Sequence, residues 1–194
     1  NWCPQSLTAL SDEEVIMKPQ NSVLYKIRYD ILETPGAFVE VSTTRPETIV
    51  GDVALAIHPD DPRWENLKGK HAMRPINPQA IPIIADEAVE KDFGTGILKI
   101  TPAHDRLDFE IAQRHELPMI EILAPDGTLN EHAGGEYIGM DRFSARKKAA
   151  KQLADDEKLI DEEDHQNNVG FSERAGVPIE PRLSEQWFLK YPRV

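Results

Sequence analysis

Alternating apolar and polar residues mark two segments early in the chain as strands. Residues 23–29 and residues 37–44 repeat with the period of two that is typical of β-strands with one buried face. The sequence Thr34-Pro35-Gly36 between them is a turn signal. We therefore predict that these segments form a β-hairpin.

Shorter apolar runs predict further strands. Residues 53–57, 81–85 and 97–100 have lengths that suit buried strands better than helices. We also expect a strand over residues 117–123. The acidic segment 155–164 holds seven acids against one lysine, so we expect it to be exposed to solvent.

Two segments show helical spacing. One begins near Asp105 and runs to about residue 115, with Leu107 and Ile111 four residues apart, and the other covers about residues 141–153. Several short strands with a few helices predict a mixed α/β fold. We expect a β-barrel or folded sheet at its centre, with flanking helices and short stem strands.

The two ends of the sequence suggest a piece of a larger polypeptide. The chain starts at Asn1 and stops at Val194 without the character of a tail. We expect an N-terminal stem at residues 1–20, a domain core at residues 21–168 and a return stem at residues 169–194.

Composition narrows the class of protein. The chain has 22 Lys and Arg against 34 Asp and Glu, a net charge of −12, and 40% hydrophobic residues. Its apolar runs are far shorter than the roughly 18–20 residues of a membrane span, and no basic and apolar leader opens it. We therefore expect a folded, cytoplasmic protein without a signal peptide or membrane contact. The acidic excess argues against a standalone nucleic-acid binder.

The first candidate motif is the hexapeptide at residues 43–48, at the end of a predicted strand. Alternation puts Thr43 on the same inward face as Val41. Pro46 favours extended backbone at Arg45, which projects a guanidinium able to fork onto a phosphate or carboxylate. The alternative interpretation is a strand end followed by a helix start, with Arg45 paired to Glu47.

The second candidate motif covers residues 93–108. Glycines on both sides of Thr95 let the backbone approach a ligand closely. Lys99 interrupts an apolar strand, where it needs an anion or a pocket mouth, unless it guards an edge strand. Asp105 is an N-cap candidate, and Asp108 lies at the capping-box position, so Asp108 either stabilises the helix or anchors a cation.

Familiar catalytic and metal-binding patterns are missing. The sequence has no Gly-x-Ser-x-Gly elbow and no phosphate-binding Gly-x-x-x-x-Gly-Lys loop. His104 lacks a second histidine at a ligand spacing, and the single cysteine, Cys3, excludes an internal disulfide and a multi-cysteine zinc site. We expect no metal, and any hydrolysis would rely on a positioned water.

The two motifs, taken in order, closely resemble the editing domain, or connective polypeptide, of class I aminoacyl-tRNA synthetases. This domain is inserted into the catalytic fold of the valyl, isoleucyl and leucyl enzymes. The resemblance covers nearly the whole chain, and residues 172–181 together with Lys99 are similar to the valyl form. Some relatives carry a second cysteine where this chain has Ser6, so we expect no zinc site at the stem.

The resemblance implies hydrolysis of the ester in mischarged threonyl-tRNA(Val), and also of threonyl-adenylate. Threonine is nearly isosteric with valine, so a pocket shaped for valine rejects it poorly and a second site is needed. The alternatives are a non-catalytic module that positions the tRNA 3′ end, and an editing domain of an isoleucyl-type synthetase.

By position, the resemblance also implies roles for individual residues. Asp108 is expected to be the catalytic residue, because its carboxylate would hold the α-ammonium group of the substrate. The substrate-binding hydroxyls are expected to be those of Thr43, Thr44 and Thr48.

Four further residues are expected to bind substrate. Arg45 and Lys99 would hold the phosphate or ribose side of the tRNA end, and Phe93 would stack on the terminal adenine. His104 joins them if its ring faces the pocket.

The resemblance implies as partners the 3′ end of tRNA(Val) carrying threonine and the rest of the parent synthetase. The isolated domain is expected to be a monomer that binds tRNA weakly. Editing would need no cofactor, and ATP would serve only the aminoacylation reaction of the parent. This chain cannot aminoacylate, because the His-Ile-Gly-His and Lys-Met-Ser-Lys-Ser signatures are absent.

Overall fold

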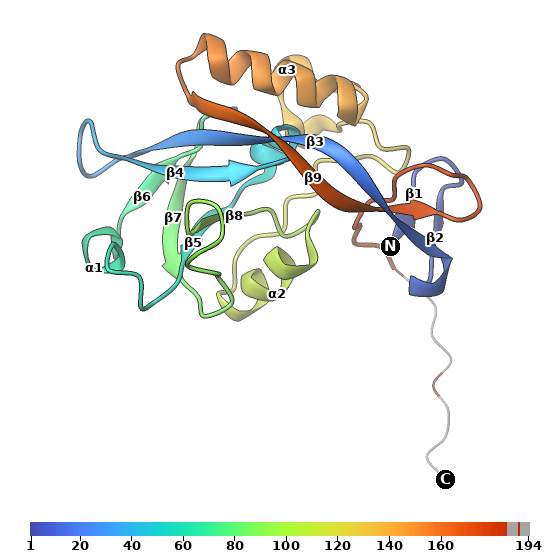
Figure 1. The fold of residues 1–194 in the computed structure, drawn as a ribbon, viewed down its shortest axis with the longest axis horizontal. Helices are drawn as coiled ribbons and strands as arrows, with labels where there is room; N and C mark the ends of the chain where they lie inside the picture. Colours follow the sequence, from blue (N-terminus) through green and yellow to red (C-terminus); the bar gives the residue numbers. More distant parts are fainter. Residues whose placement is uncertain (186–189, 191–194) are drawn as a thin grey trace.

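A curled sheet with a few helices around it makes up the fold, seen in a computed structural model that describes residues 1–185 and residue 190 (Figure 1). The strands are β1 (Trp2–Cys3), β2 (Thr8–Ala9), β3 (Val15–Ile31), β4 (Phe38–Thr43), β5 (Ala54–Ile57), β6 (His71–Met73), β7 (Ala80–Ala85), β8 (Ile97–Ile100) and β9 (Leu159–Ser172). The α-helices are α1 (Trp64–Leu67), α2 (Arg106–Arg114) and α3 (Arg142–Asp155). Short 3₁₀ helices are η1 (Asp12–Glu14), η2 (Pro46–Gly51), η3 (Glu131–Ala133) and η4 (Gly135–Tyr137).

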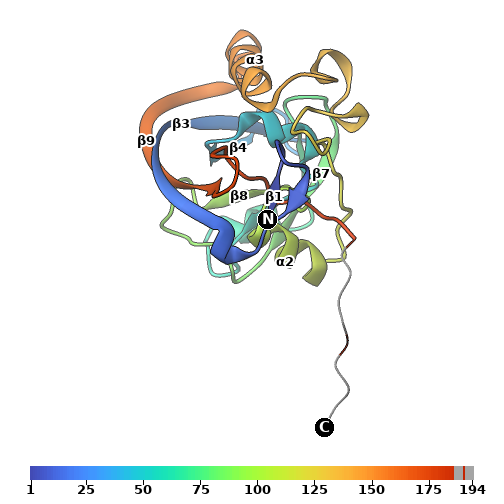
Figure 2. The same cartoon turned by 90° about the vertical axis from the view of Figure 1, so that its right-hand side faces the viewer.

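The main sheet runs in the order β4-β3-β6-β7-β5-β8, and β9 pairs with β3. Figure 2 shows how the strands curve around the interior as a half-barrel. Helix α3 covers one side of this sheet and α2 lies on the opposite side, beside β8 (Figure 1). The predicted mixed α/β fold with a curled sheet and flanking helices is confirmed.

The predicted hairpin is formed by the end of β3 and by β4. Their antiparallel register pairs Tyr25 with Thr43 and Tyr29 with Val39. Val39, Val41 and Thr43 are all buried, so the inward orientation predicted for Thr43 is confirmed. The hairpin thus delivers the first motif to the interior of the molecule.

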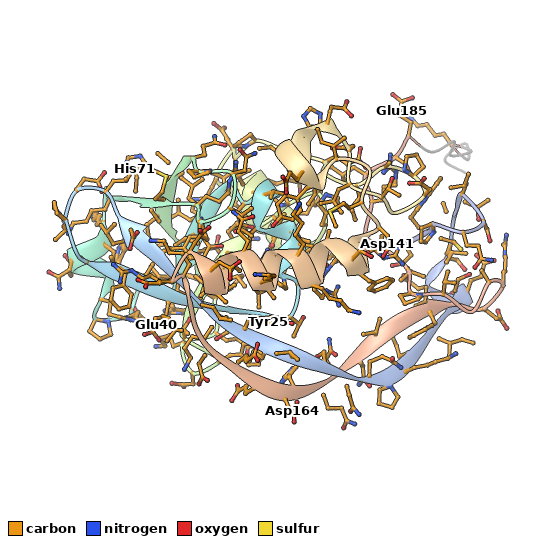
Figure 3. The ribbon with its side chains drawn as sticks, turned by 90° about the horizontal axis from the view of Figure 1, so that it is seen from above. Tyr25, Glu40, His71, Asp141, Asp164 and Glu185 are labelled. Atoms are coloured by element: carbon orange, nitrogen blue, oxygen red, sulfur yellow. The ribbon has the colours of Figure 1, made fainter. Side chains whose placement is uncertain are left out.

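A long two-stranded ribbon of β3 and β9 extends beyond the hairpin, with Val15 opposite Ser172 and Tyr25 opposite Glu162. The acidic residues near Asp164 are exposed as expected, but they belong to β9, which the sequence pattern did not predict (Figure 3). A ribbon exposed on both faces needs no alternation of apolar and polar residues, because neither face has to be buried.

Two apolar clusters fill the interior. The larger lies between the sheet, η2 and α3, and includes Ile27 and Leu153. The smaller lies where α2 meets β5 and β8, and there Ile111 packs with Ile100. The burial of Ile111 sets the position of α2 against the end of β8, and therefore the position of the second motif.

Most of the other predicted elements are confirmed, within one or two residues, as β5, β7, β8, α2 and α3. The strand predicted over residues 117–123 is wrong, because only an isolated bridge between Leu123 and Leu129 forms there. The amide of Ile122 donates to the His104 ring, and its carbonyl accepts from Asn130. These bonds replace a strand ladder.

The stems meet in the structure. Trp2 and Glu180 exchange two backbone hydrogen bonds, of 2.9 and 3.0 Å, which join the start of the chain to its return segment. The division into stems and core stays a prediction. The last part of the expected return stem, residues 186–189 and 191–194, lies outside the described residues.

Gly51 is closely packed against its neighbours, so a larger residue at this position should lower the stability of the fold. A Cβ at this position would lie 3.0 Å from Ile122 Cγ2 and 3.2 Å from Thr101 Cγ2. We expect Gly51→Ala to lower the free energy of unfolding by about 1–2 kcal/mol, because the extra methyl group overpacks the core. Urea unfolding of the two proteins measures the difference, and equal stability would show that these neighbours move aside at no cost.

Candidate functional site

The two sequence motifs meet at one end of the sheet. Thr43 ends β4, and η2 then carries Thr48 into the interior, where it is 2% exposed. Lys99 lies on β8, and Thr101 follows that strand directly. Helix α2 begins after Asp105 and presents its buried face to the same region. Segments about 50 residues apart in the sequence are thus joined by direct hydrogen bonds.

A buried ion pair between Lys99 and Asp52 connects these elements. The Lys99 Nζ lies 3.1 Å from Asp52 Oδ1, and the two side chains are 9% and 0% exposed. The same ammonium donates to Thr48 Oγ1 at 2.8 Å and to Thr101 Oγ1 at 2.5 Å. An ammonium has three N–H donors, so every donor of Lys99 has an acceptor. Its charge is balanced inside the protein.

Asp52 is the central acceptor of this cluster, and sequence reasoning missed it. Tyr29 donates its hydroxyl to Asp52 Oδ2 at 2.7 Å, and Thr101 donates to Oδ1 at 2.6 Å. The available signal was a single carboxylate within the otherwise apolar run of residues 49–57. A charged residue in such a run requires a buried partner, and here that partner is Lys99.

Asp108 lies beside this cluster, 4% exposed on the buried face of α2. Its Oδ2 accepts a hydrogen bond of 2.8 Å from the backbone N–H of Thr101. Asp105 caps the helix as predicted, with Oδ1 accepting from the amides of Leu107 and Asp108. The carboxylate of Asp108 therefore binds the end of β8.

Burial raises the pKa of Asp108 to about 7. The nearby charge of Lys99 opposes this rise, whereas the negative charges of Asp105 and Asp52 add to it. Near neutral pH the carboxyl group is therefore divided between its neutral and ionised forms. A bound cation would shift it to the ionised form.

Arg45 is held by acidic partners. Its guanidinium lies 2.7 Å from Glu180 Oε2 and 3.2 Å from Glu47 Oε1, and it also donates to the carbonyl of His104 at 3.4 Å. The pairing with Glu47, which was the alternative interpretation of the sequence, is therefore present. Burial works against the charged form, but the carboxylates of Glu180 and Glu47 raise the pKa of Arg45.

Glu47 is fully buried and binds a second guanidinium. Arg146 on α3 donates to both of its carboxylate oxygens, at 2.7 and 2.9 Å. Burial alone would raise the pKa of Glu47, but these bonds and the charge of Arg45 lower it. The ion pair thereby ties η2 to α3 and holds the first motif in place.

The remaining hydroxyls of the first motif differ in their surroundings. Thr43 Oγ1 accepts from the amide of Arg45 at 3.1 Å, which fixes the turn after β4. Thr44 is half-buried and lines a groove beside α3. Thr48 donates to the Arg45 carbonyl at 2.9 Å while it accepts from Lys99.

His104 is buried behind the site. Its Nε2 accepts from the backbone N–H of Ile122 at 2.9 Å, which fixes the ring. Burial lowers the pKa of His104 to about 3, and the positive charges of Arg45 and Lys99 lower it further. The ring is therefore neutral at neutral pH, and its Nε2 is occupied.

Phe93 stands at the rim of a separate hollow. Its ring is 64% exposed and lines an apolar cavity of about 370 Å³ together with Ser42, Leu98 and Leu107. Gly94 lies next to Ser42 on β4, and a Cβ on this glycine would come within 3.3 Å of the serine Cβ. Leu107 and Ser42 directly precede Asp108 and Thr43 in the sequence, so this cavity adjoins both motifs.

The predicted site residues thus fall into four groups. Thr48 and Lys99 share one buried cluster, to which Asp108 is joined through Thr101. Arg45 and His104 are joined by a hydrogen bond from the guanidinium to the His104 carbonyl, and Phe93 lines the separate apolar cavity. At the end of β4, Thr43 is buried and Thr44 is half-buried. Within residues 1–185 and residue 190, no cluster of three or more acidic, histidine or cysteine side chains is arranged to hold a metal ion. That same part of the chain contains no helix that is long and apolar enough to span a membrane.

The chain is similar to known proteins. Residues 65–140 match the family described as leucyl-tRNA synthetase, editing domain. The chain is 52% identical to the valine–tRNA ligase of Gloeobacter violaceus over 189 residues. This matched region covers 97% of this chain and 21% of that protein. The valine–tRNA ligase of Porphyromonas gingivalis is also 52% identical, over 190 residues that cover 98% of this chain and 22% of that protein.

A solved structure supports the fold. The LeuRS of Agrobacterium radiobacter K84, in a ternary complex with tRNA and LeuAMS, superimposes with a TM-score of 0.57 at 16% identity. The match covers 78% of this chain and 20% of that chain. At this identity the comparison supports the architecture alone.

Fold, motif order and relatives agree on the class of protein. The chain belongs to the editing domains of class I aminoacyl-tRNA synthetases. Within that class it is of the valyl type, as its similarity to valine–tRNA ligases over nearly all of its length indicates. It spans about a fifth of the length of those relatives.

The raised pKa of Asp108 predicts how stability depends on pH. The folded-state value of about 7 lies above the ordinary 3.8, so the folded chain holds this proton more tightly than the unfolded chain. The contribution of Asp108 to stability is therefore greatest below pH 4 and is lost as pH rises to 7, by up to about 4 kcal/mol. Asp108→Asn should remove this loss and be more stable than the natural chain at pH 8.

Chemical unfolding at pH 5 and pH 8 measures the effect. Glu110→Gln is the matched control, because it removes an exposed carboxylate from the same helix and should leave the pH dependence unchanged. If Asp108→Asn kept the full pH dependence, the buried carboxyl group would not be its source.

Proposed function

We propose that this chain hydrolyses the ester bond of threonyl-tRNA(Val), as the editing domain of a valine–tRNA ligase, and that it also acts on threonyl-adenylate. The similarity to valine–tRNA ligases supports a parent enzyme of this kind, and the match to an editing-domain family supports hydrolysis as the reaction of this chain. The tRNA(Val) 3′ end and the rest of the synthetase are then its partners, and the parent acts in the cytoplasm. ATP is needed only for the parent's aminoacylation, and editing uses no cofactor.

The observation that carries the proposal is the buried carboxyl group of Asp108, which Thr101 and Lys99 connect to Thr48 of the first motif. An α-ammonium group placed beside it would donate a charge-assisted hydrogen bond to the carboxylate and would favour its ionised form. The amide of Thr101 already orients this carboxylate from behind. Asp108 therefore serves as the anchor that fixes the amino acid part of the substrate.

Hydrolysis then follows from positioning. A water oxygen attacks the ester carbonyl carbon, the bond from that carbon to the ribose oxygen breaks, and the ribose oxygen leaves with a proton. The products are free threonine and the tRNA with its terminal hydroxyl. The ester is already activated, so an ordered water beside a fixed set of donors accelerates the reaction without a covalent intermediate.

Selection of threonine rests on its hydroxyl group. The hydroxyl of Thr48 is already bound to Lys99 and to the carbonyl of Arg45. In this proposal the hydroxyls of Thr43 and Thr44 therefore pair with that of the substrate, and Thr48 contributes only by exchanging one of its bonds. Valine in the same position would offer these hydroxyls no partner, and an unpaired buried polar group costs about 1–3 kcal/mol. The site thus removes the amino acid that a valine-shaped pocket accepts by mistake.

The other motif residues support the tRNA side of the substrate in this proposal. Phe93 stacks on the terminal adenine, for which its exposed ring and the apolar cavity beside it are suited. Arg45 and Lys99 are the groups proposed for the ribose and phosphate side, and to bind there they would have to exchange the internal partners that hold them in this structure. His104, neutral and buried, keeps the turn between β8 and α2 in place.

One observation favours a second candidate, a non-catalytic module that positions the tRNA end. All three donors of Lys99 are used inside the protein, and Arg45 is paired to two carboxylates. Residues that only stabilise the fold would be arranged in this way. Deacylation by an Asp108 variant distinguishes the two candidates.

We expect Asp108→Ala in the full-length synthetase to slow deacylation of threonyl-tRNA(Val) by at least about tenfold, the value of one lost charge-assisted bond. The natural enzyme should gain activity as pH rises through about 7, relative to the uncatalysed reaction, because only the ionised carboxylate binds the ammonium. Rates measured from pH 5.5 to 8.5 test both statements. Glu110→Ala is the matched control, and unchanged deacylation by Asp108→Ala would favour the positioning module.

A ligand series tests the selectivity. A non-hydrolysable threonyl-adenosine analogue should bind the site, and its valyl counterpart should bind at least about fivefold more weakly, because one polar group is left unpaired. Calorimetric titration measures both affinities. Equal binding would contradict recognition of the threonine hydroxyl, whatever the deacylation rates show.

A further inference from the structure

A groove of about 320 Å³ separates the β3–β9 ribbon from the N-terminal end of α3, and we call it the ribbon groove. Its walls come from β3, β9, α3, the turn after β4 and the return segment near Glu180. Figure 3 shows α3, which begins after the labelled Asp141, lying alongside the ribbon. The ribbon groove is distinct from the apolar cavity beside Phe93.

Two guanidinium groups lie close to an exposed aromatic ring on the α3 wall. Phe143 is 40% exposed, and the guanidinium carbons of Arg142 and Arg146 lie 4.6 and 5.5 Å from its ring centroid. The exposed part of this ring is apolar surface in contact with water. Such a surface suits a nucleobase, which stacks on the ring.

The negative charge in the groove is neutralised by neighbouring arginines. Among the described residues that line the groove, Glu180 has the one carboxylate, which lies 2.7 Å from Arg45 and 2.9 Å from Arg142. On the ribbon wall the polar lining includes the side-chain amides of Asn21 and Asn167. In a chain of net charge −12, this is a surface that a polyanion can approach.

The ribbon groove leads directly to the first motif. Thr44 and Arg45 line it, and Arg45 also contacts the backbone of His104 at the start of the second motif. A flexible strand lying in the groove would therefore pass Arg45, the residue that connects the first motif to the start of the loop before α2. The lining combines side-chain amides, one exposed aromatic ring, paired guanidinium groups and a few apolar side chains. This mixture fits a single-stranded nucleic acid better than a wholly apolar protein segment.

We propose that the ribbon groove binds the single-stranded nucleotides directly 5′ of the terminal adenosine, with the base of one nucleotide stacked on Phe143. This assignment rests on the proposed editing function and adds to it the path of the substrate strand. It makes Phe143 a positioning residue that acts only on substrates longer than the terminal adenosine.

The test compares two substrates in the full-length synthetase: threonyl-tRNA(Val) and the threonyl ester of adenosine alone. Phe143→Ala should lower kcat/KM for threonyl-tRNA(Val) by at least about fivefold, the lower end of what one stacked base contributes. It should leave hydrolysis of the adenosine ester unchanged. Phe143→Tyr keeps the ring and should restore the rate with tRNA. Ile138→Ala is the matched control, because Ile138 is 54% exposed and lies outside the groove.

Asn167→Ala removes an amide from the opposite wall of the groove. It should lower kcat/KM for threonyl-tRNA(Val) by less than Phe143→Ala does, and it should also leave hydrolysis of the adenosine ester unchanged. Equal effects of Phe143→Ala on both substrates, or no effect on either, would overturn the proposal. So would a lower melting temperature of the full-length enzyme with unchanged rates, which would indicate that another part of the synthetase covers the groove. Failure of the editing function itself would show separately, as an Asp108→Ala variant that still deacylates normally.

Discussion

The buried ion pair of Lys99 and Asp52 is the interaction on which the rest of the site depends. It joins β8 to the end of η2, two elements that come from distant parts of the sequence. Taking two charges out of water is costly, and the cost is recovered only when hydrogen bonds satisfy both groups. Here Tyr29, Thr48 and Thr101 supply those bonds. Losing either charge would leave its partner buried without compensation.

The pair also determines the chemistry of its neighbour. Thr101 is bound through its side chain to Asp52 and Lys99, and through its amide to Asp108. The orientation of the Asp108 carboxyl group therefore follows from the ion pair. Because the charge of Lys99 is already balanced by Asp52, it only partly offsets the effect of burial on Asp108. Under the proposed function, a site built in this way keeps its carboxylate available for a cation brought by the substrate.

Much of the fold follows from the sequence, and parts of the site do not. Alternation and turn signals predicted the β3–β4 hairpin, and spacing predicted α2 with its cap at Asp105. Ribbon strand β9 escaped prediction because an element exposed on both faces carries no alternation. The motif residues could be identified, but Lys99 and Arg45 were expected to face a ligand. Their acidic partners, Asp52 and Glu180, lie 47 and 135 residues away, and only the fold brings such groups together.

The central claim is that this buried cluster holds Asp108 ready to bind the ammonium group of threonine. Carbon-13 NMR titration of the Asp108 carboxyl group tests it most directly, first in the free chain and then with a non-hydrolysable threonyl-adenosine analogue bound. The account predicts a pKa near 7 in the free chain and a clearly lower pKa when the analogue is bound. A pKa near the ordinary 3.8 in the free chain, or a value that the analogue does not change, would contradict it.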